Sequence, residues 1–143
     1  MTGTAQIVWE SIALIVREKG IANIPVNGRS MLPFIVGGED WVLLKRPETL
    51  KVGDVVFADT KEKGYVIHRI DSIAADGTYA LLGDGNLGFR EHCQLADIKA
   101  IAVEVIKPDG RHKPLGYGFR AKMWRRLLPI RRYLLWIYFR FAN

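Results

Sequence analysis

Short apolar runs separated by glycine-containing turns are the feature of this sequence that most restricts its fold. The runs are rich in β-branched and aromatic residues and cover residues 21–26, 41–45, 55–58, 65–73, 79–82 and 98–106. The segments between them carry glycine beside Asp or Asn, as in Asp76-Gly77. Strands at such short intervals predict a compact, mainly antiparallel β fold of the barrel or sandwich type.

Helices are expected at both ends of the chain. Residues 5–19 place apolar side chains at spacings of three and four, which is typical of an amphipathic helix, and Gly20 is a natural stop. Residues 120–143 again have a helical pattern, which Pro129 interrupts. For a chain of 143 residues we expect one β domain over residues 1–112, with its N-terminal helix, followed by a helical tail over residues 113–143.

The tail carries the positive charge of the chain. Of the 21 Lys and Arg residues, eight lie from Lys113 onward, where there is no Asp or Glu, and this leaves 13 basic residues against 15 acidic ones in the body. Arginines in the tail alternate with Trp, Tyr, Leu and Ile. This pattern suits an anionic membrane surface, and it equally suits packing on the body or on a partner protein. Nucleic acid is the least favoured partner because the body is mildly acidic.

The sequence also indicates a location and a lack of metal chemistry. No run reaches the roughly 18–20 apolar residues that a spanning helix needs. The first residues lack a basic segment and Glu10 interrupts their apolar run, so we expect no signal peptide and a protein that is cytoplasmic or peripheral at the membrane. A single cysteine, Cys93, excludes an internal disulfide and a cysteine-built zinc site. No metal or organic cofactor is implied.

Three side chains could carry nucleophilic chemistry. Ser30 follows a polar turn and immediately precedes apolar residues. His68 lies in the strand pattern YVIHRI, where alternation puts it on one face with Val66 and Ile70 and would hold it stiffly, as a general base requires. Asp84, at the end of another apolar run, could orient the imidazole. Taken singly, each also has a structural explanation, as a turn serine, a strand histidine and a turn aspartate.

The order of four short motifs resembles that of the signal peptidase I superfamily, which also includes the self-cleaving SOS-type repressors. The motifs are Ser30-Met31-x-Pro33, Gly53-Asp54-Val55-Val56, His68-Arg69 and Gly83-Asp84-x-Asn86, and the resemblance covers roughly residues 22–106. Bacterial signal peptidases and the repressors use a lysine base, whereas the archaeal and endoplasmic-reticulum type uses a histidine that is commonly followed by arginine. The chain therefore resembles the histidine branch.

The resemblance implies a serine endopeptidase with Ser30 as nucleophile and His68 as base. Members of this branch usually carry a second acid six or seven residues after the aspartate, where this chain has Arg90 and Glu91. Three arrangements remain open: Asp84 as the third residue, which we favour, Glu91 in its place, or a Ser–His dyad. Around the nucleophile, Gly28, Arg29 and Met31 are the expected oxyanion and substrate-binding residues.

The expected substrate is a leader or precursor peptide, cut at one bond and bound as an extended strand. Typical members have a membrane-spanning segment just before the serine motif, where this chain has its amphipathic helix at 5–19. The alternative function is a non-catalytic β module that binds a peptide or a partner protein.

Cys93 beside His92 is a weaker candidate nucleophile, since a strand would point the two side chains to opposite faces.

Overall fold

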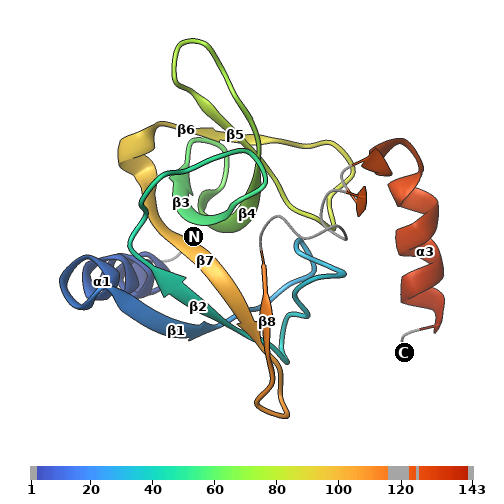
Figure 1. Cartoon of the computed structure of the whole chain (residues 1–143), viewed down its shortest axis with the longest axis horizontal. Coiled ribbons are helices and arrows are strands. Elements are labelled where there is room, and N and C mark those ends of the chain that lie inside the picture. Colours follow the sequence, from blue (N-terminus) through green and yellow to red (C-terminus); the bar gives the residue numbers. More distant parts are fainter. Residues whose placement is uncertain (1–2, 116–122, 125, 142–143) are drawn as a thin grey trace.

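The structure, a computed structural model, describes residues 3–115, 123–124 and 126–141. It contains eight strands in one antiparallel sheet, with a helix at each end of the described chain (Figure 1). The helices are α1 (Gly3–Lys19) and α3 (Arg131–Phe141), with short 3-10 helices η1 (Leu95–Asp97) and η2 (Leu128–Ile130). The strands are β1 (Ile21–Pro25), β2 (Trp41–Lys45), β3 (Val55–Thr60), β4 (Gly64–Ile73), β5 (Tyr79–Leu82), β6 (Glu91–Cys93), β7 (Ile98–Ile106) and β8 (His112–Pro114).

The strand order shows how distant parts of the chain meet. The sheet runs β1-β2-β7-β3-β4-β5-β6, and β8 pairs with β7. Strand β7 therefore lies between β2 and β3, so it joins the β1–β2 hairpin to the β3–β4 hairpin. The sheet curves into a half-barrel, and α1 packs against β1 and β7 (Figure 1).

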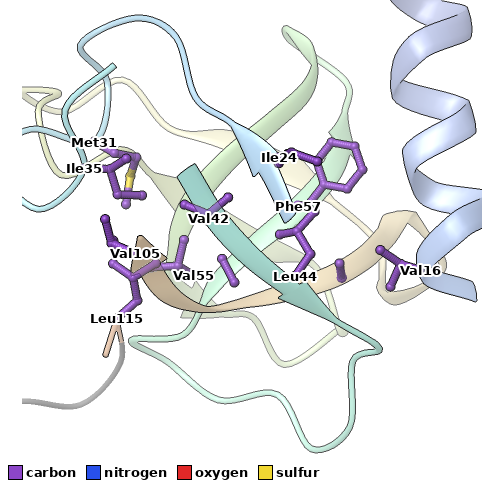
Figure 2. Close-up of a cluster of buried hydrophobic side chains, with 12 residues drawn as sticks. Val16, Ile24, Met31, Ile35, Val42, Leu44, Val55, Phe57, Val105 and Leu115 are labelled. Atoms are coloured by element: carbon purple, nitrogen blue, oxygen red, sulfur yellow. The ribbon is translucent and has the colours of Figure 1, made fainter. Parts of the chain in front are cut away.

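Two apolar clusters stabilise this sheet. The larger one is formed by the inner side chains of β1, β2, β3 and β7 together with the buried face of α1 (Figure 2). Trp9, Ile12 and Val16 provide that face, because spacings of three and four place them on one side of the helix. The smaller cluster gathers Val56, Ile70 and their neighbours on β3, β4 and β5. Burial of these side chains is the main favourable contribution to folding.

The expected fold is confirmed as mainly antiparallel β with an N-terminal and a C-terminal helix. Helix α1 ends at Lys19, where Gly20 has a φ of 85° and donates its N–H to the carbonyl of Val16. Pro129 lies in η2, and α3 begins at Arg131, directly after η2. The expected interruption is therefore present. Residues 116–122 of the expected tail lie outside the described residues.

Two features of the sheet were not expected. Strands β6 and β8 have three residues each, too few for a periodic pattern to be recognised. Strand β8 extends the sheet beyond residue 112, where we expected the domain to end, and Leu115 is buried in the larger cluster.

Among the described residues, no helix is both long and apolar enough to cross a membrane.

Candidate active site

Ser30 lies in a turn that follows β1 and is only partly buried. The preceding bend depends on Gly28, whose φ of 85° is a left-handed conformation that favours glycine. Gly37 packs closely against this bend, since a Cβ on Gly37 would lie 2.0 Å from the Gly28 carbonyl oxygen. The carbonyl of Ser30 accepts a hydrogen bond of 2.8 Å from the N–H of Gly85. The serine is thus held by a segment more than fifty residues away.

His68 is buried on β4, opposite Val56 of β3. Its Nδ1 forms a short hydrogen bond with the Oε1 of Glu91, which is fully buried on β6. A carboxylate accepts and does not donate, so this contact places the ring proton on Nδ1 and leaves the lone pair on Nε2. An imidazole in this state can accept a proton through Nε2.

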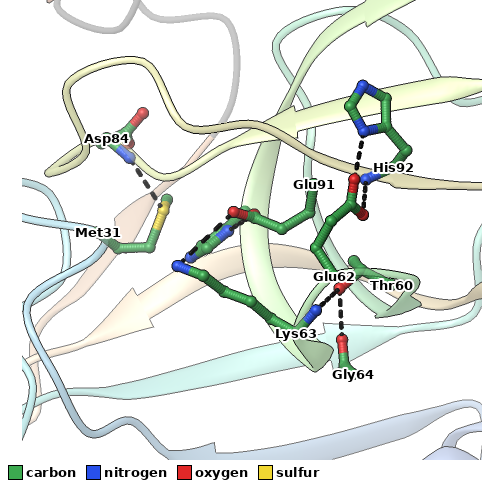
Figure 3. Close-up of polar contacts among 9 residues, drawn as sticks. Met31, Thr60, Glu62, Lys63, Gly64, Asp84, Glu91 and His92 are labelled. Carbon is green, nitrogen blue, oxygen red and sulfur yellow. Dashed lines mark hydrogen bonds and ion pairs between the residues drawn. The ribbon is translucent and has the colours of Figure 1, made fainter.

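The second oxygen of Glu91 faces a lysine. Oε2 of Glu91 has no hydrogen-bond partner among the described residues, and Nζ of Lys63 lies 3.9 Å away (Figure 3). The Lys63 ammonium also lies 4.9 Å from the ring centroid of Phe89. Lys63 sits in the β3–β4 turn and is half-exposed, so its attraction to Glu91 is partly screened by solvent. It adds a positive charge beside the His68–Glu91 pair.

Gly83 brings the serine and the histidine together. A Cβ placed on Gly83 would lie 2.4 Å from the carbonyl oxygen of Ser30 and 3.1 Å from Cδ2 of His68. The imidazole therefore presents Cδ2, the carbon bonded to Nε2, to Gly83, and the Ser30 carbonyl lies at the same position. Both residues also line one cavity of about 180 Å³. The two residues that the sequence singled out, 38 positions apart, are therefore neighbours in space.

Asp84 does not contact His68, contrary to the arrangement that we favoured from the sequence. Its carboxylate forms a buried, two-pronged ion pair with Arg69, with distances of 2.8 Å to Nε and 2.7 Å to Nη2. The reason is the alternation of β4: consecutive residues point to opposite faces, so His68 and Arg69 find their carboxylates on opposite sides. Glu91, the alternative acid, is the one that reaches the imidazole.

The other expected residues surround the serine in different ways. Met31 is buried in the larger cluster, lines the cavity, and accepts a hydrogen bond from the N–H of Asp84 at its sulfur, at 3.4 Å (Figure 3). Arg29 is exposed, and its carbonyl lies against Gly85, where a Cβ would come within 2.3 Å. The cavity itself is mainly apolar; besides Ser30 and His68 its lining includes side chains from α1, β3 and β4, namely Trp9, Phe57, Tyr65 and Ile67.

Cys93 and His92 do not form a competing site. Cys93 is fully buried, and burial raises the pKa of its thiol to about 11. A thiol that stays protonated is a poor nucleophile. His92 points the other way, where its Nδ1 lies 2.6 Å from the carboxylate of Glu62 (Figure 3). Within the ranges that the structure describes, no group of His, Cys, Asp and Glu side chains is arranged to hold a metal ion.

The C-terminal segment contacts the same loop that holds the serine. Trp124 donates its indole N–H to the carbonyl of Asp84 at 2.7 Å. Arg131, at the start of α3, donates to the carbonyls of Asn86 and Trp124 at 3.2 Å and 3.1 Å. Figure 1 shows α3 beside this loop. Of the surfaces on which the tail was expected to pack, the body is therefore one, since Trp124 and Arg131 both bind to it.

Comparisons with known proteins found no match to this chain among family models, curated proteins or solved structures.

Proposed function

We propose that this protein is a serine endopeptidase that cuts a leader or precursor peptide. The observation that carries the proposal is the buried Glu91–His68 pair, whose imidazole lines the same cavity as Ser30 and meets the Ser30 segment at Gly83. A nucleophile, a base and a carboxylate that orients the base are the three parts of a hydrolytic serine site. The four motifs that resemble the signal peptidase I superfamily add independent support.

In the proposed reaction, Nε2 of His68 removes the proton from the hydroxyl of Ser30 as the serine oxygen attacks the peptide carbonyl carbon. The C–N bond then breaks, and the histidine returns the proton to the leaving amine, which leaves an acyl group on Ser30. Water, activated by the same histidine, attacks the ester and releases the carboxylate product with a free serine. Glu91 stabilises the imidazolium that forms in both steps.

The negative charge on the carbonyl oxygen requires hydrogen-bond donors. The backbone N–H of Ser30 is the donor that the turn provides, and Gly28 lets the chain approach closely. In some relatives a hydroxyl residue two positions before the nucleophile assists, and Gly28 has no such group. We therefore assign Ser30 N–H as the first donor and leave the second to another group of the loop.

An open strand edge supports the assignment of an extended peptide as substrate. Residues 64–69 of β4 pair with β3 on one edge, whereas β5 pairs on the other edge only from Arg69 onward. Within the described strands, the second edge of residues 65–68 therefore has no neighbour. This edge ends at His68 and borders the apolar cavity beside Ser30. A substrate strand could pair with it and place one side chain in that cavity.

Covalent labelling with a fluorophosphonate probe tests this function without knowledge of the substrate. An activated serine attacks the phosphorus and displaces fluoride, so the protein should be labelled at Ser30. Ser30→Ala should abolish labelling, and His68→Ala should slow it by orders of magnitude. Ser72→Ala, which changes an exposed serine on β4, is the matched control and should label normally.

The alternative function is a non-catalytic β module that binds a peptide or a partner protein, and the same experiment distinguishes it from an enzyme. If the folded protein is not labelled, or if Ser30→Ala is labelled at the same rate, Ser30 is not an activated nucleophile and the proposed mechanism is wrong. Peptide binding without labelling would favour the module.

A further inference from the structure

The two sides of helix α3 differ in burial: the inner side packs on the protein, and the outer side is exposed to solvent. Arg131 and Leu135, one turn apart, are buried. The outer side consists of two rows of exposed residues, each at a spacing of four, which puts the members of a row above one another. The first row is Arg132, Trp136 and Arg140, and the second is Tyr133, Ile137 and Phe141.

The second row and Trp136 form a continuous apolar surface. The exposed fractions are 63% for Tyr133, 61% for Trp136, 47% for Ile137 and 76% for Phe141. Large side chains left open to water over about two helical turns are unfavourable in isolation, and such a patch typically marks an interaction site. Ile130, in the adjoining η2, is exposed as well and extends the patch toward the start of the helix.

The first row adds positive charge along one side of the apolar surface. The guanidinium of Arg140 lies 5.5 Å from the ring centroid of Trp136, and that of Arg132 lies 5.7 Å from Tyr133. Arg126 is also exposed on the segment before η2. The sequence from Lys113 onward contains no acidic residue that could neutralise them.

We propose that this outer face of α3 docks on an anionic lipid surface. Aromatic rings flanked by arginines fit the boundary between headgroups and acyl chains, where the rings insert and the guanidinium groups bind phosphate. The lack of acidic residues favours a negatively charged partner over a second copy of the same helix, whose arginines would repel it. The long aliphatic and phenyl side chains of Ile137 and Phe141 favour lipid over nucleic acid, which offers no apolar layer to receive them.

The inner contacts of α3 determine what such docking would bring to the lipid surface. Arg131 binds the carbonyl of Asn86, and Trp124 binds the carbonyl of Asp84, in the loop whose Gly85 holds Ser30. Docking through α3 would therefore hold the Ser30 loop near the membrane. The docking proposal rests on exposure and charge alone and does not require Ser30 to be catalytic.

Co-sedimentation of the full-length protein with vesicles tests the proposal. We expect binding to phosphatidylserine-containing vesicles, weak binding to pure phosphatidylcholine vesicles, and partial loss of binding at high salt. Each basic side chain near an anionic surface contributes about a fivefold gain in affinity, so R132A/R140A should weaken binding by roughly 25-fold. Trp136→Ser should remove much of the binding that survives at high salt.

Matched variants control for charge and for apolar area elsewhere. Lys19→Ala with Lys45→Ala removes two exposed charges from α1 and β2, and Trp41→Ser removes an exposed tryptophan from β2. Both should bind vesicles normally. The proposal is overturned if the wild-type protein does not bind anionic vesicles, or if the control variants lose as much binding as the α3 variants. It is also overturned if α3 mediates dimerisation, or binding to a single-stranded oligonucleotide, while the protein does not bind vesicles.

Discussion

Arg69 and Asp84 form a buried, two-pronged ion pair that joins β4 to the loop after β5. Arg69 also donates to the carbonyl of Gly53 at 2.8 Å, so its guanidinium connects three segments. Removal of one member of a buried pair leaves the other charged and without compensation. The pair therefore has a structural role in holding the loop, and it leaves orientation of the imidazole to Glu91.

The two carboxylates should respond differently to loss of charge. Glu91→Gln keeps the size of the side chain but no longer holds the imidazole with Nδ1 protonated, so fluorophosphonate labelling should slow by roughly 10³–10⁴-fold. Asp84→Asn should instead lower the free energy of unfolding by about 3–5 kcal/mol. Labelling rates and denaturant titrations of both variants provide the comparison. If the Asp84→Asn protein is folded but is not labelled, and the Glu91→Gln protein is labelled at the wild-type rate, then Asp84 and not Glu91 orients the imidazole.

The pH dependence of labelling tests the histidine base. A histidine base must be neutral to accept a proton, so labelling should decline when acid protonates the imidazole. A loss confined to pH values below about 4.5, where carboxylates titrate, would argue against a histidine base.

Cys93 should be inert in the folded protein. Burial raises the pKa of its thiol to about 11, and a raised pKa keeps the thiol protonated at every pH below that value. Iodoacetamide at pH 8 should therefore neither modify the native protein nor slow fluorophosphonate labelling, whereas the unfolded chain should be alkylated. Rapid alkylation of the native protein together with loss of reactivity would favour a thiol nucleophile.

Gly83→Ala probes the close approach that brings the site together. The added Cβ would meet the Ser30 carbonyl oxygen at 2.4 Å, so the two segments must separate and the Gly85–Ser30 hydrogen bond should weaken. We expect labelling to fall at least tenfold, at a stability cost of a few kcal/mol. Gly77→Ala is the control: its Cβ meets nothing within 4 Å, and its φ of 90° adds only local strain. Equal labelling of the two variants would show that the Gly83 contact is dispensable.

The sequence predicted six of the eight strands because their apolar patterns are long enough to be periodic. Strand β6 is not predicted because its three residues are too few to show an alternating pattern. The burial of Glu91, which lies on β6, therefore cannot be predicted from the sequence either. The choice between Asp84 and Glu91 depends on which face of β4 each carboxylate reaches, and this is settled by packing across the sheet. The contacts of Trp124 and Arg131 join residues about forty positions apart, which local patterns do not reveal.

The central position of β7 bears on when the candidate site forms during synthesis. Ser30 lies between β1 and β2, and His68 belongs to the β3–β4 hairpin. Strand β7 is made after both and pairs with β2 and β3, so it joins the two halves of the sheet. Contacts of such large sequence separation form late in folding because closing long loops costs entropy. In a ribosome-bound chain that has not yet exposed residues 98–106, Ser30, His68 and Glu91 would be present before the two halves of the sheet are joined. Under the proposed function, this order of strands delays formation of the cleavage site until β7 has been made.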